Sequence, residues 1–91
     1  MTDYNKIFEH NDQKFTYREA QIILCCARGL TAQQAADLLC ISYHTVKTHR
    51  EHIRDRFGLH GHHALDQLAI KLLPELEKSV TLPIKIGNVT D

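Results

Sequence analysis

Residues 42–60 concentrate the side chains of this chain that can bind a polyanion. This segment holds four basic residues against two acidic ones, whereas residues 1–41 and residues 61–91 each hold one acidic residue more than they hold basic ones. The net charge of the whole chain is zero, so the positive excess is local and weak. We therefore expect a modest affinity for nucleic acid with a strong salt dependence. Four of the seven histidines lie in the same segment, namely His44, His49, His52 and His60.

Lys47, Thr48 and Glu51 are candidates for contact with nucleotide bases. Lysine can donate to guanine O6 or N7 or to a phosphate, threonine can contact the thymine methyl group, and glutamate can accept from cytosine N4. Tyr43 and His44 precede them, at the start of an expected helix, where phosphate binding is favoured. A solvated helix face without a binding role would carry the same residue types. The elements that position these side chains decide between the two interpretations.

A helix-turn-helix pattern surrounds these candidates. Ala36 is small where a second helix must cross, Cys40 lies at the turn, and Val46 is apolar where the gap between the two helices must be filled. The pattern predicts a helix over 32–40 and a longer helix over 42–57. This arrangement places the second helix where it can enter a major groove.

Capping residues support these two helices and an additional helix before them. Thr16 and Thr31 are each followed, three residues later, by the Glu or Gln of a capping box. The first of these boxes predicts a helix over 17–28, which Gly29 ends. Ser42 caps the third helix, and Gly58 ends it. In this third helix, Val46, Ile53 and Phe57 form the buried stripe with His49 beside it, and the opposite face holds Lys47, Thr48, Glu51 and Arg54.

The fourth helix is predicted from about His62 to Leu72, and Pro74 is expected to end it because the residue before a proline disfavours helical torsions. The fold class is therefore all-α, with four helices over 15–73. Residues 1–14 are expected to form an arm or a frayed helix. The tail over 74–91 has the alternation of a strand, which is either disordered or paired with another chain. The alternating residues are Val80, Leu82, Ile84 and Ile86.

Composition fits one small globular domain, with 43% apolar and 24% charged residues. The longest apolar run, Ile22 to Ala27, is too short to span a bilayer. The N-terminus lacks the apolar core of a signal peptide, so we expect a cytoplasmic protein without a membrane partner. A nucleophile elbow, a glycine-rich phosphate loop and a paired-carboxylate site are all absent from the sequence. We therefore predict that the chain is not an enzyme.

The clustered histidines and three cysteines leave a metal or thiol sensor open as a further alternative. His60, His62 and His63 lie close together in sequence, but no cysteine-rich motif accompanies them to complete a zinc site. Cys25 and Cys26 are adjacent, which favours reduced thiols over a disulfide framework. At least one of them is expected to act as a small buried hydrophobic residue. We predict no bound metal and no cofactor.

The segment from about Phe15 to Leu72 resembles the DNA-binding domain of LuxR-type, or GerE-type, bacterial transcription regulators. The matching stretches are FTYREAQIILCCARGLT, AADLLCIS and TVKTHREHIRDRFGL, followed by the apolar fourth helix. The resemblance implies that the third helix reads the major groove and that the fourth supports dimerisation. It also implies that Lys47, Thr48 and Glu51 face base edges and that Thr45 lies near phosphates.

The chain departs from the family pattern in three places. His62 stands where an arginine or lysine commonly touches phosphate, Gly61 replaces a Ser or Asn cap, and Arg50 stands where Leu or Val is frequent. No receiver or ligand-binding domain precedes the motif, so the chain resembles the stand-alone, single-domain members. The candidate DNA-binding residues are Tyr43, His44, Thr45, Lys47, Thr48, Arg50, Glu51, Arg54 and His62.

Two functions follow from this sequence. The first is a sequence-specific transcription regulator that binds double-stranded DNA as a homodimer through its fourth helix. The alternative is a small interaction protein that forms heterodimers with a larger LuxR-type regulator, or antagonises it. The neutral net charge, His62 in place of a cation and the strand-like tail from Val80 to Ile86 favour this alternative, since such a tail could add to a sheet edge of a partner.

Overall fold

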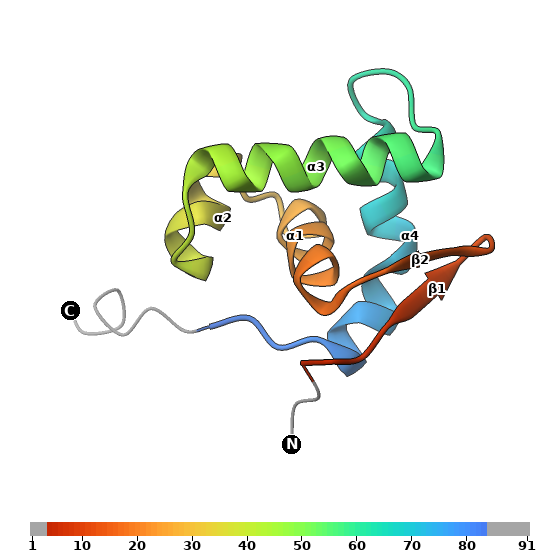
Figure 1. Ribbon diagram of the computed structural model, residues 1–91, viewed down its shortest axis with the longest axis horizontal. Helices are drawn as coiled ribbons and strands as arrows, with labels where there is room; N and C mark the ends of the chain where they lie inside the picture. The colour runs from red at the N-terminus through yellow and green to blue at the C-terminus, as the bar shows by residue number, and fades with distance from the viewer. Residues whose placement is uncertain (1–3, 84–91) are drawn as a thin grey trace.

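A computed structural model of the protein describes residues 4–83, and Figure 1 shows α1 at the centre of the bundle, with α3 crossing over it and α4 beside it. The expected all-α domain of four helices is confirmed, and a small two-stranded sheet precedes it. Within the described residues no helix is both long enough and apolar enough to cross a membrane. The elements are β1 (Phe8–His10), β2 (Gln13–Phe15), α1 (Tyr17–Ala27), α2 (Ala32–Leu39), α3 (Tyr43–Phe57) and α4 (Ala64–Ser79).

The predicted caps of the first three helices are confirmed. The Thr16 hydroxyl accepts a hydrogen bond from the backbone N–H of Glu19 at 3.1 Å, and the Thr16 N–H donates to the Glu19 carboxylate at 2.9 Å. Thr31 and Gln34 make the same pair of bonds at the start of α2. The Ser42 hydroxyl accepts from the N–H of Thr45 at 3.0 Å. These local bonds satisfy backbone donors that the first turn of a helix leaves free, and so they fix where each helix begins.

The core forms around α1, which packs against both α3 and α4. The side chains of Ile22, Ile23 and Leu24 are fully buried there. Val46 of α3 is also fully buried, and Ala36 of α2 is 1% exposed. The small Ala36 side chain lets α3 cross α2 closely, as the helix-turn-helix spacing predicts.

The N-terminal arm contains a β-hairpin over residues 8–15, so the expectation of a frayed helix there is wrong. Phe8 pairs with Phe15 across the hairpin, and their rings stack with centroids 5.3 Å apart. Asn11 and Asp12 form the turn with φ angles of 52° and 64°, a left-handed conformation that these residue types tolerate and that two-residue hairpins require. Both phenylalanines are 3% exposed. The hairpin therefore depends on tertiary packing, because strands of three residues are not stable alone.

Helix α4 continues to Ser79 with Pro74 inside it, so the predicted end at Pro74 is wrong. Proline removes the hydrogen bond to the carbonyl of Ile70 and costs about 3 kcal/mol or more in a helix interior. Ile70 and Pro74 both lie on the exposed side of α4, so water can satisfy that carbonyl. Leu76 and Val80, at 1% and 6% exposed, lie beyond the proline. Burying two such side chains contributes about 1.5–3 kcal/mol each, which offsets the cost of the proline.

The C-terminal segment after α4 is held on α1 by two side chains. The Tyr17 hydroxyl accepts from the N–H of Thr81 at 2.7 Å, and the Gln21 amide donates to the carbonyl of Thr81 at 2.9 Å. Val80 has an extended backbone, but residues 80–83 form no strand, and Thr81 bonds to α1 instead. Ile84 and Ile86, the other half of the predicted alternation, lie outside the described residues. For Val80 and Leu82 the alternation reflects packing on the core of this chain.

Candidate nucleic-acid interface

A short turn between α2 and α3 directs the start of α3 across the bundle. Cys40 ends α2 in the left-handed conformation, with φ 58°, and its backbone N–H donates to the carbonyl of Ala36. Ser42 then caps α3, and its hydroxyl lies 2.8 Å from the hydroxyl of Thr45. Cys40 at the turn, the small Ala36 and the apolar Val46 therefore lie where their spacing in the sequence predicts.

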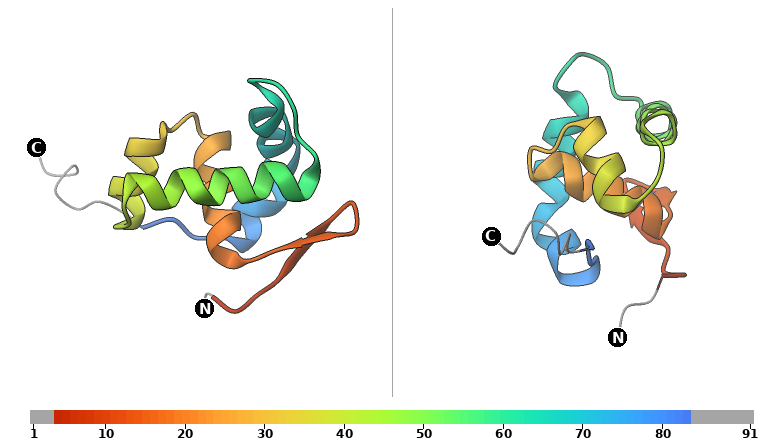
Figure 2. Two further views of the ribbon diagram at one scale, coloured as in Figure 1. Left: turned by 45° about the horizontal axis from the view of Figure 1, so that its top comes forward. Right: turned by 90° about the vertical axis from the view of Figure 1, so that its left-hand side faces the viewer.

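One side of α3 is buried and the other is free. Val46 and Ile53 are fully buried, and Phe57 packs against the core. The right-hand view of Figure 2 looks almost along α3 and shows the helix at the margin of the bundle, with no other element covering its outer side. Because this side faces away from the core, side chains on it can reach a ligand that docks along the helix. The exposed residues of α3 are Tyr43, His44, Lys47, Glu51, His52 and Asp55.

Lys47 is exposed and makes one weak contact. Its Nζ lies 5.3 Å from the centroid of the Tyr43 ring, one turn earlier, and Tyr43 is 46% exposed. Such a cation–π contact at an exposed site contributes about 0.5–1 kcal/mol, which an ionic contact with a ligand can replace. Within the described part of the chain no ion pair joins Lys47 to Glu51, although they are four residues apart on one helix. Both charged groups are therefore available to a ligand.

Thr45 and Thr48 are half-buried at the sides of α3, whereas His44 is exposed at its start. The hydroxyls of Thr45 and Ser42 form a hydrogen bond with each other, and the first-turn N–H groups of α3 lie beside this pair. Hydroxyl and N–H groups at a helix N-terminus form the usual setting for a phosphate. The start of α3 thus presents donors, and its middle presents Lys47, Thr48 and Glu51.

Arg50 and Arg54 are half-buried, and Arg50 has an intramolecular role that the sequence did not reveal. Its guanidinium donates to the carbonyl of Leu30 at 3.3 Å, and so it joins α3 to the loop between α1 and α2. Its Nε is buried, and no hydrogen-bond partner for it is found within residues 4–83. Arg50 thereby fixes the N-terminal half of α3 as well as adding positive charge to it.

His62 lies in the loop between α3 and α4, beyond the C-terminal end of α3. It is exposed, and Gly61 before it adopts φ 93°. His63 precedes α4 as its N-cap residue but makes no side-chain capping bond. The structure therefore separates His62 from Tyr43 and His44, which lie at the opposite end of α3.

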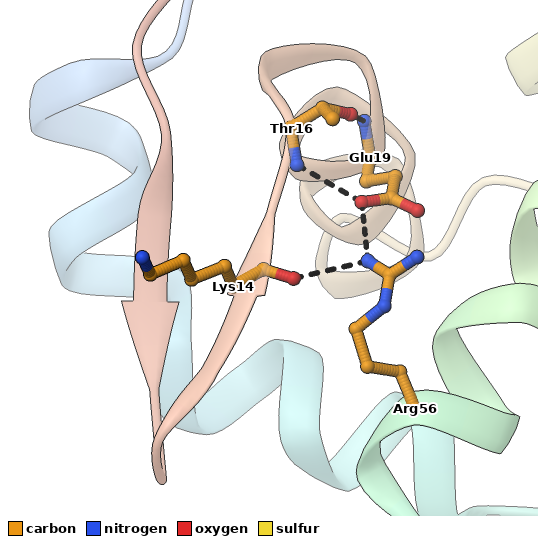
Figure 3. Close-up of polar contacts among 4 residues, drawn as sticks. All are labelled: Lys14, Thr16, Glu19 and Arg56. Carbon is orange, nitrogen blue, oxygen red and sulfur yellow. Dashed lines mark hydrogen bonds and ion pairs between the residues drawn. The ribbon is translucent and has the colours of Figure 1, made fainter.

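A polar cluster at the C-terminal end of α3 was missed from the sequence (Figure 3). Arg56 Nη1 donates to Glu19 Oε1 at 2.6 Å and to the backbone carbonyl of Lys14 at 3.1 Å. Burial raises the pKa of Glu19, but the hydrogen bonds from Arg56 and from the N–H of Thr16 lower it by more, so its pKa lies below the ordinary value. The partners are 37 and 42 residues apart in sequence, and one sequence gives no signal that joins them.

The cysteines and histidines of the described residues form neither a disulfide nor a candidate metal cluster. Burial, together with the neighbouring Cys26 thiol, raises the pKa of Cys25 to about 11. Burial also raises the pKa of Cys26. Both thiols therefore stay protonated at neutral pH, which makes them poor nucleophiles. They act as small hydrophobic residues in the core, beside the contact of Arg50 with Leu30.

The fold and the free outer side of α3 define a helix-turn-helix domain with an exposed second helix. A sequence model of the family described as bacterial regulatory proteins, luxR family (GerE), matches residues 13–69, which is more than half of the chain. The chain belongs to this family and is a DNA-binding transcription regulator. The match includes β2 but not β1, and it ends within α4. Comparisons with curated proteins and with solved structures return no match.

Proposed function

We propose that the protein binds specific sequences of double-stranded DNA by inserting α3 into the major groove. The observation that carries this proposal is the division of α3 into a buried stripe, with Val46 and Ile53, and a free side with Lys47 and Glu51. A helix about 10–12 Å wide fits the major groove when one side is unobstructed. The hydrogen-bonding groups on that side then meet the edges of the base pairs.

Different residues contribute to position and to sequence preference. We assign phosphate contacts to Tyr43, His44 and Thr45 at the start of α3, because helix N-termini favour phosphate. Lys47, Thr48 and Glu51 are assigned to base edges, which carry the sequence information. Arg50, Arg54 and His62 contribute positive charge at the sides and the far end of α3, where they contact the backbone of the duplex.

We also propose a homodimer formed through α4. The support is Ile70, a large apolar side chain that is 61% exposed on the outer side of α4. A twofold dimer favours an inverted repeat with half-site centres about one helical turn, or 10 base pairs, apart. The sequence predicts a DNA-binding domain over residues 15–73. We propose that this domain extends further in both directions, because Phe8 belongs to the core and α4 continues to Ser79. We retain a cytoplasmic location as part of this proposal.

Selection of bound duplexes from a random library tests this function. The proposal predicts enrichment of a palindrome, and an affinity for that palindrome that falls steeply with salt. A shuffled duplex of the same composition is the control, and it should bind more weakly at every salt concentration. Failure to enrich any sequence, with equal binding to both duplexes, would contradict the proposal.

The alternative function is an interaction protein that pairs with a larger LuxR-type regulator and prevents it from binding DNA. Two observations favour it. Glu51 and Asp55 are both exposed on α3, where a polyanion would meet them, and His62 replaces a permanent cation. The C-terminal residues Val80 and Leu82 give it no support, since they pack on the core of this chain. The same selection from a random library distinguishes the two functions, because this alternative predicts that the protein alone enriches no sequence.

A further inference from the structure

The two ends of α3 are held by different parts of the molecule. The N-terminal end is fixed by the turn at Cys40 and the Ser42 cap, and the Arg50 side chain in the middle of the helix donates to the carbonyl of Leu30. The C-terminal end reaches the hairpin and the start of α1 through Arg56 and Phe57. A helix held at one end alone can tilt about that end, whereas a helix held at both ends has a fixed direction.

The contact at the C-terminal end is short and partly buried. Arg56 donates from one nitrogen to Glu19 and to the carbonyl of Lys14, and the Glu19 side chain is only 6% exposed (Figure 3). The same oxygen of Glu19 also accepts the N–H of Thr16, at the N-terminus of α1. A buried carboxylate that loses its cation is left uncompensated, so the pair resists separation. Arg56 thus joins α3 to β2 and to α1 at once.

An apolar contact lies next to this ion pair. The Phe57 ring meets the Phe15 ring edge to face, with centroids 5.9 Å apart, and the His10 ring lies 6.1 Å from Phe57 on the other strand of the hairpin. Phe15 in turn stacks on Phe8. The hairpin therefore packs against the last turn of α3 and supports it. Its first strand lies outside the part of the chain that the family model matches.

We propose that Arg56 is a positioning residue for DNA recognition. Together with the hairpin, it sets the angle at which α3 enters the major groove. The inference rests on the proposed function, and it assigns Arg56 no contact with DNA. If the C-terminal contact is lost, α3 can tilt about its start at Ser42, because the long Arg50 side chain can keep its 3.3 Å hydrogen bond to Leu30 through a small tilt. Glu51 lies about 13 Å from that point and Lys47 about 7 Å. A tilt of about 10° then moves Glu51 by about 2 Å and Lys47 by about 1 Å, and functional sites tolerate about 0.5 Å.

Because this displacement grows with distance from Ser42, the inference predicts an order in which base preferences are lost along α3. Base preference that depends on Glu51, in the middle of α3, should be lost before base preference that depends on Lys47, near its start. A merely stabilising ion pair would lower the amount of folded protein, which reduces the apparent affinity for every sequence by the same factor and leaves the base preferences unchanged. The two roles are therefore distinguished by the pattern of selected bases, measured on folded protein.

The test compares Arg56→Gln with Arg28→Gln in the full chain. Arg28 pairs with Glu77 at 3.2 Å, an exposed Arg–Glu pair that joins α1 to α4 and does not involve α3. Both variants lose one positive charge, and neither arginine is assigned a phosphate contact, so the salt slope of nonspecific binding should be unchanged in both. We expect Arg28→Gln to select the wild-type sequence, and Arg56→Gln to bind that sequence about tenfold more weakly, the fold-change that loss of one base contact produces. The bases facing Glu51 should show the largest loss of preference.

Two more variants keep the test decisive. Arg56→Lys retains the charge and one hydrogen bond, so it should recover part of the lost base preference. Glu19→Gln retains an oxygen that can accept both hydrogen bonds, and it should show a smaller loss with the same positional pattern. This variant replaces Arg56→Gln if circular dichroism shows the latter to be unfolded. Folded variants that select the wild-type sequence with the affinity of Arg28→Gln would overturn the inference. A wild-type chain that selects no sequence would instead overturn the proposed function.

Discussion

Lys47 shows how single residues of α3 divide between folding and binding. It is exposed, and its contact with the Tyr43 ring is weak, so the fold does not depend on it. Val46, its neighbour in sequence, is fully buried and fills the gap between α2 and α3. Substitution of Lys47 should therefore change DNA affinity, whereas substitution of Val46 should change the stability of the fold.

Replacing Lys47 with alanine should weaken specific DNA binding by about 1–3 kcal/mol and leave the folding stability almost unchanged. The loss arises because the lysine donates to guanine or phosphate in the complex. Fluorescence anisotropy with the selected duplex measures it. Lys78→Ala, which removes an exposed lysine from the last turn of α4, is the control for charge alone. Equal losses in the two variants would contradict a base contact by Lys47.

Replacing Glu51 with glutamine should raise nonspecific affinity and change the selected base. A carboxylate in the groove is repelled by phosphates unless it accepts a hydrogen bond, for which cytosine N4 is the suitable donor. Glutamine removes the repulsion and pairs with adenine, so selection should shift from cytosine to adenine at one position of each half-site. Asp55→Asn removes an exposed acidic group one turn further along α3, and it should leave the selected sequence unchanged. An unaltered cytosine preference in Glu51→Gln would refute this role.

At the scale of elements, the sequence predicted what local chemistry decides. The caps at Thr16, Thr31 and Ser42 could be predicted because each bond joins residues three apart. The hairpin and the second half of α4 could not, because they depend on packing with distant residues. Pro74 disfavours a helix locally, and the burial of Leu76 and Val80 explains why α4 continues through it.

The candidate nucleic-acid interface shows the same difference between local features, which the sequence predicts, and long-range contacts, which it does not. The outward residues of α3 follow from helical spacing, so Lys47 and Glu51 could be assigned from the sequence to the free side of α3. The intramolecular contacts of Arg50 and Arg56 could not, since their partners Leu30 and Glu19 are 20 and 37 residues away. Long-range pairs of this kind leave no periodic pattern in one sequence.

The turn between α2 and α3 supplies a prediction about this element. Cys40 adopts φ 58°, a left-handed conformation that costs an L-residue about 1–2 kcal/mol and glycine very little. Because glycine also gains entropy in the unfolded chain, Cys40→Gly should raise the free energy of unfolding by only about 0.5–1 kcal/mol. Urea denaturation measures the change. Cys40→Ala keeps the Cβ atom and the strain, so it should match the wild type, and a glycine variant no more stable than the alanine variant would contradict the prediction.

At the scale of the whole molecule, the first and last segments of the described residues meet at Tyr17. The Tyr4 ring contacts the Tyr17 ring edge to face at 5.1 Å, and the Tyr17 hydroxyl accepts from Thr81. Lys6 donates to the hydroxyl of Ser79 at 3.2 Å, which joins the segment before β1 directly to the end of α4. The segments outside the matched family region thus pack on α1 at Tyr17 and leave the outer side of α3 free.

Stability of the whole domain should fall in acid in two stages. Burial lowers the pKa of His49 below its ordinary value of 6.5, so the stability it contributes is present above that value and is lost as the pH falls below it. Glu19 also has a lowered pKa, so its contribution is complete above 4.5 and is lost at lower pH. Thermal denaturation from about pH 7 to about pH 5 should show the first stage. His49→Gln should abolish it, and a first stage that persists in this variant would contradict the assignment.

The central claim is that α3 enters the major groove, and methylation interference on the selected duplex tests it most directly. Guanine N7 lies in the major groove and adenine N3 lies in the minor groove. We predict that methylation of N7 at the guanines of each half-site abolishes binding, and that methylation of N3 at adenines within the half-sites does not. Interference from the minor groove alone, or from neither groove, would contradict the account.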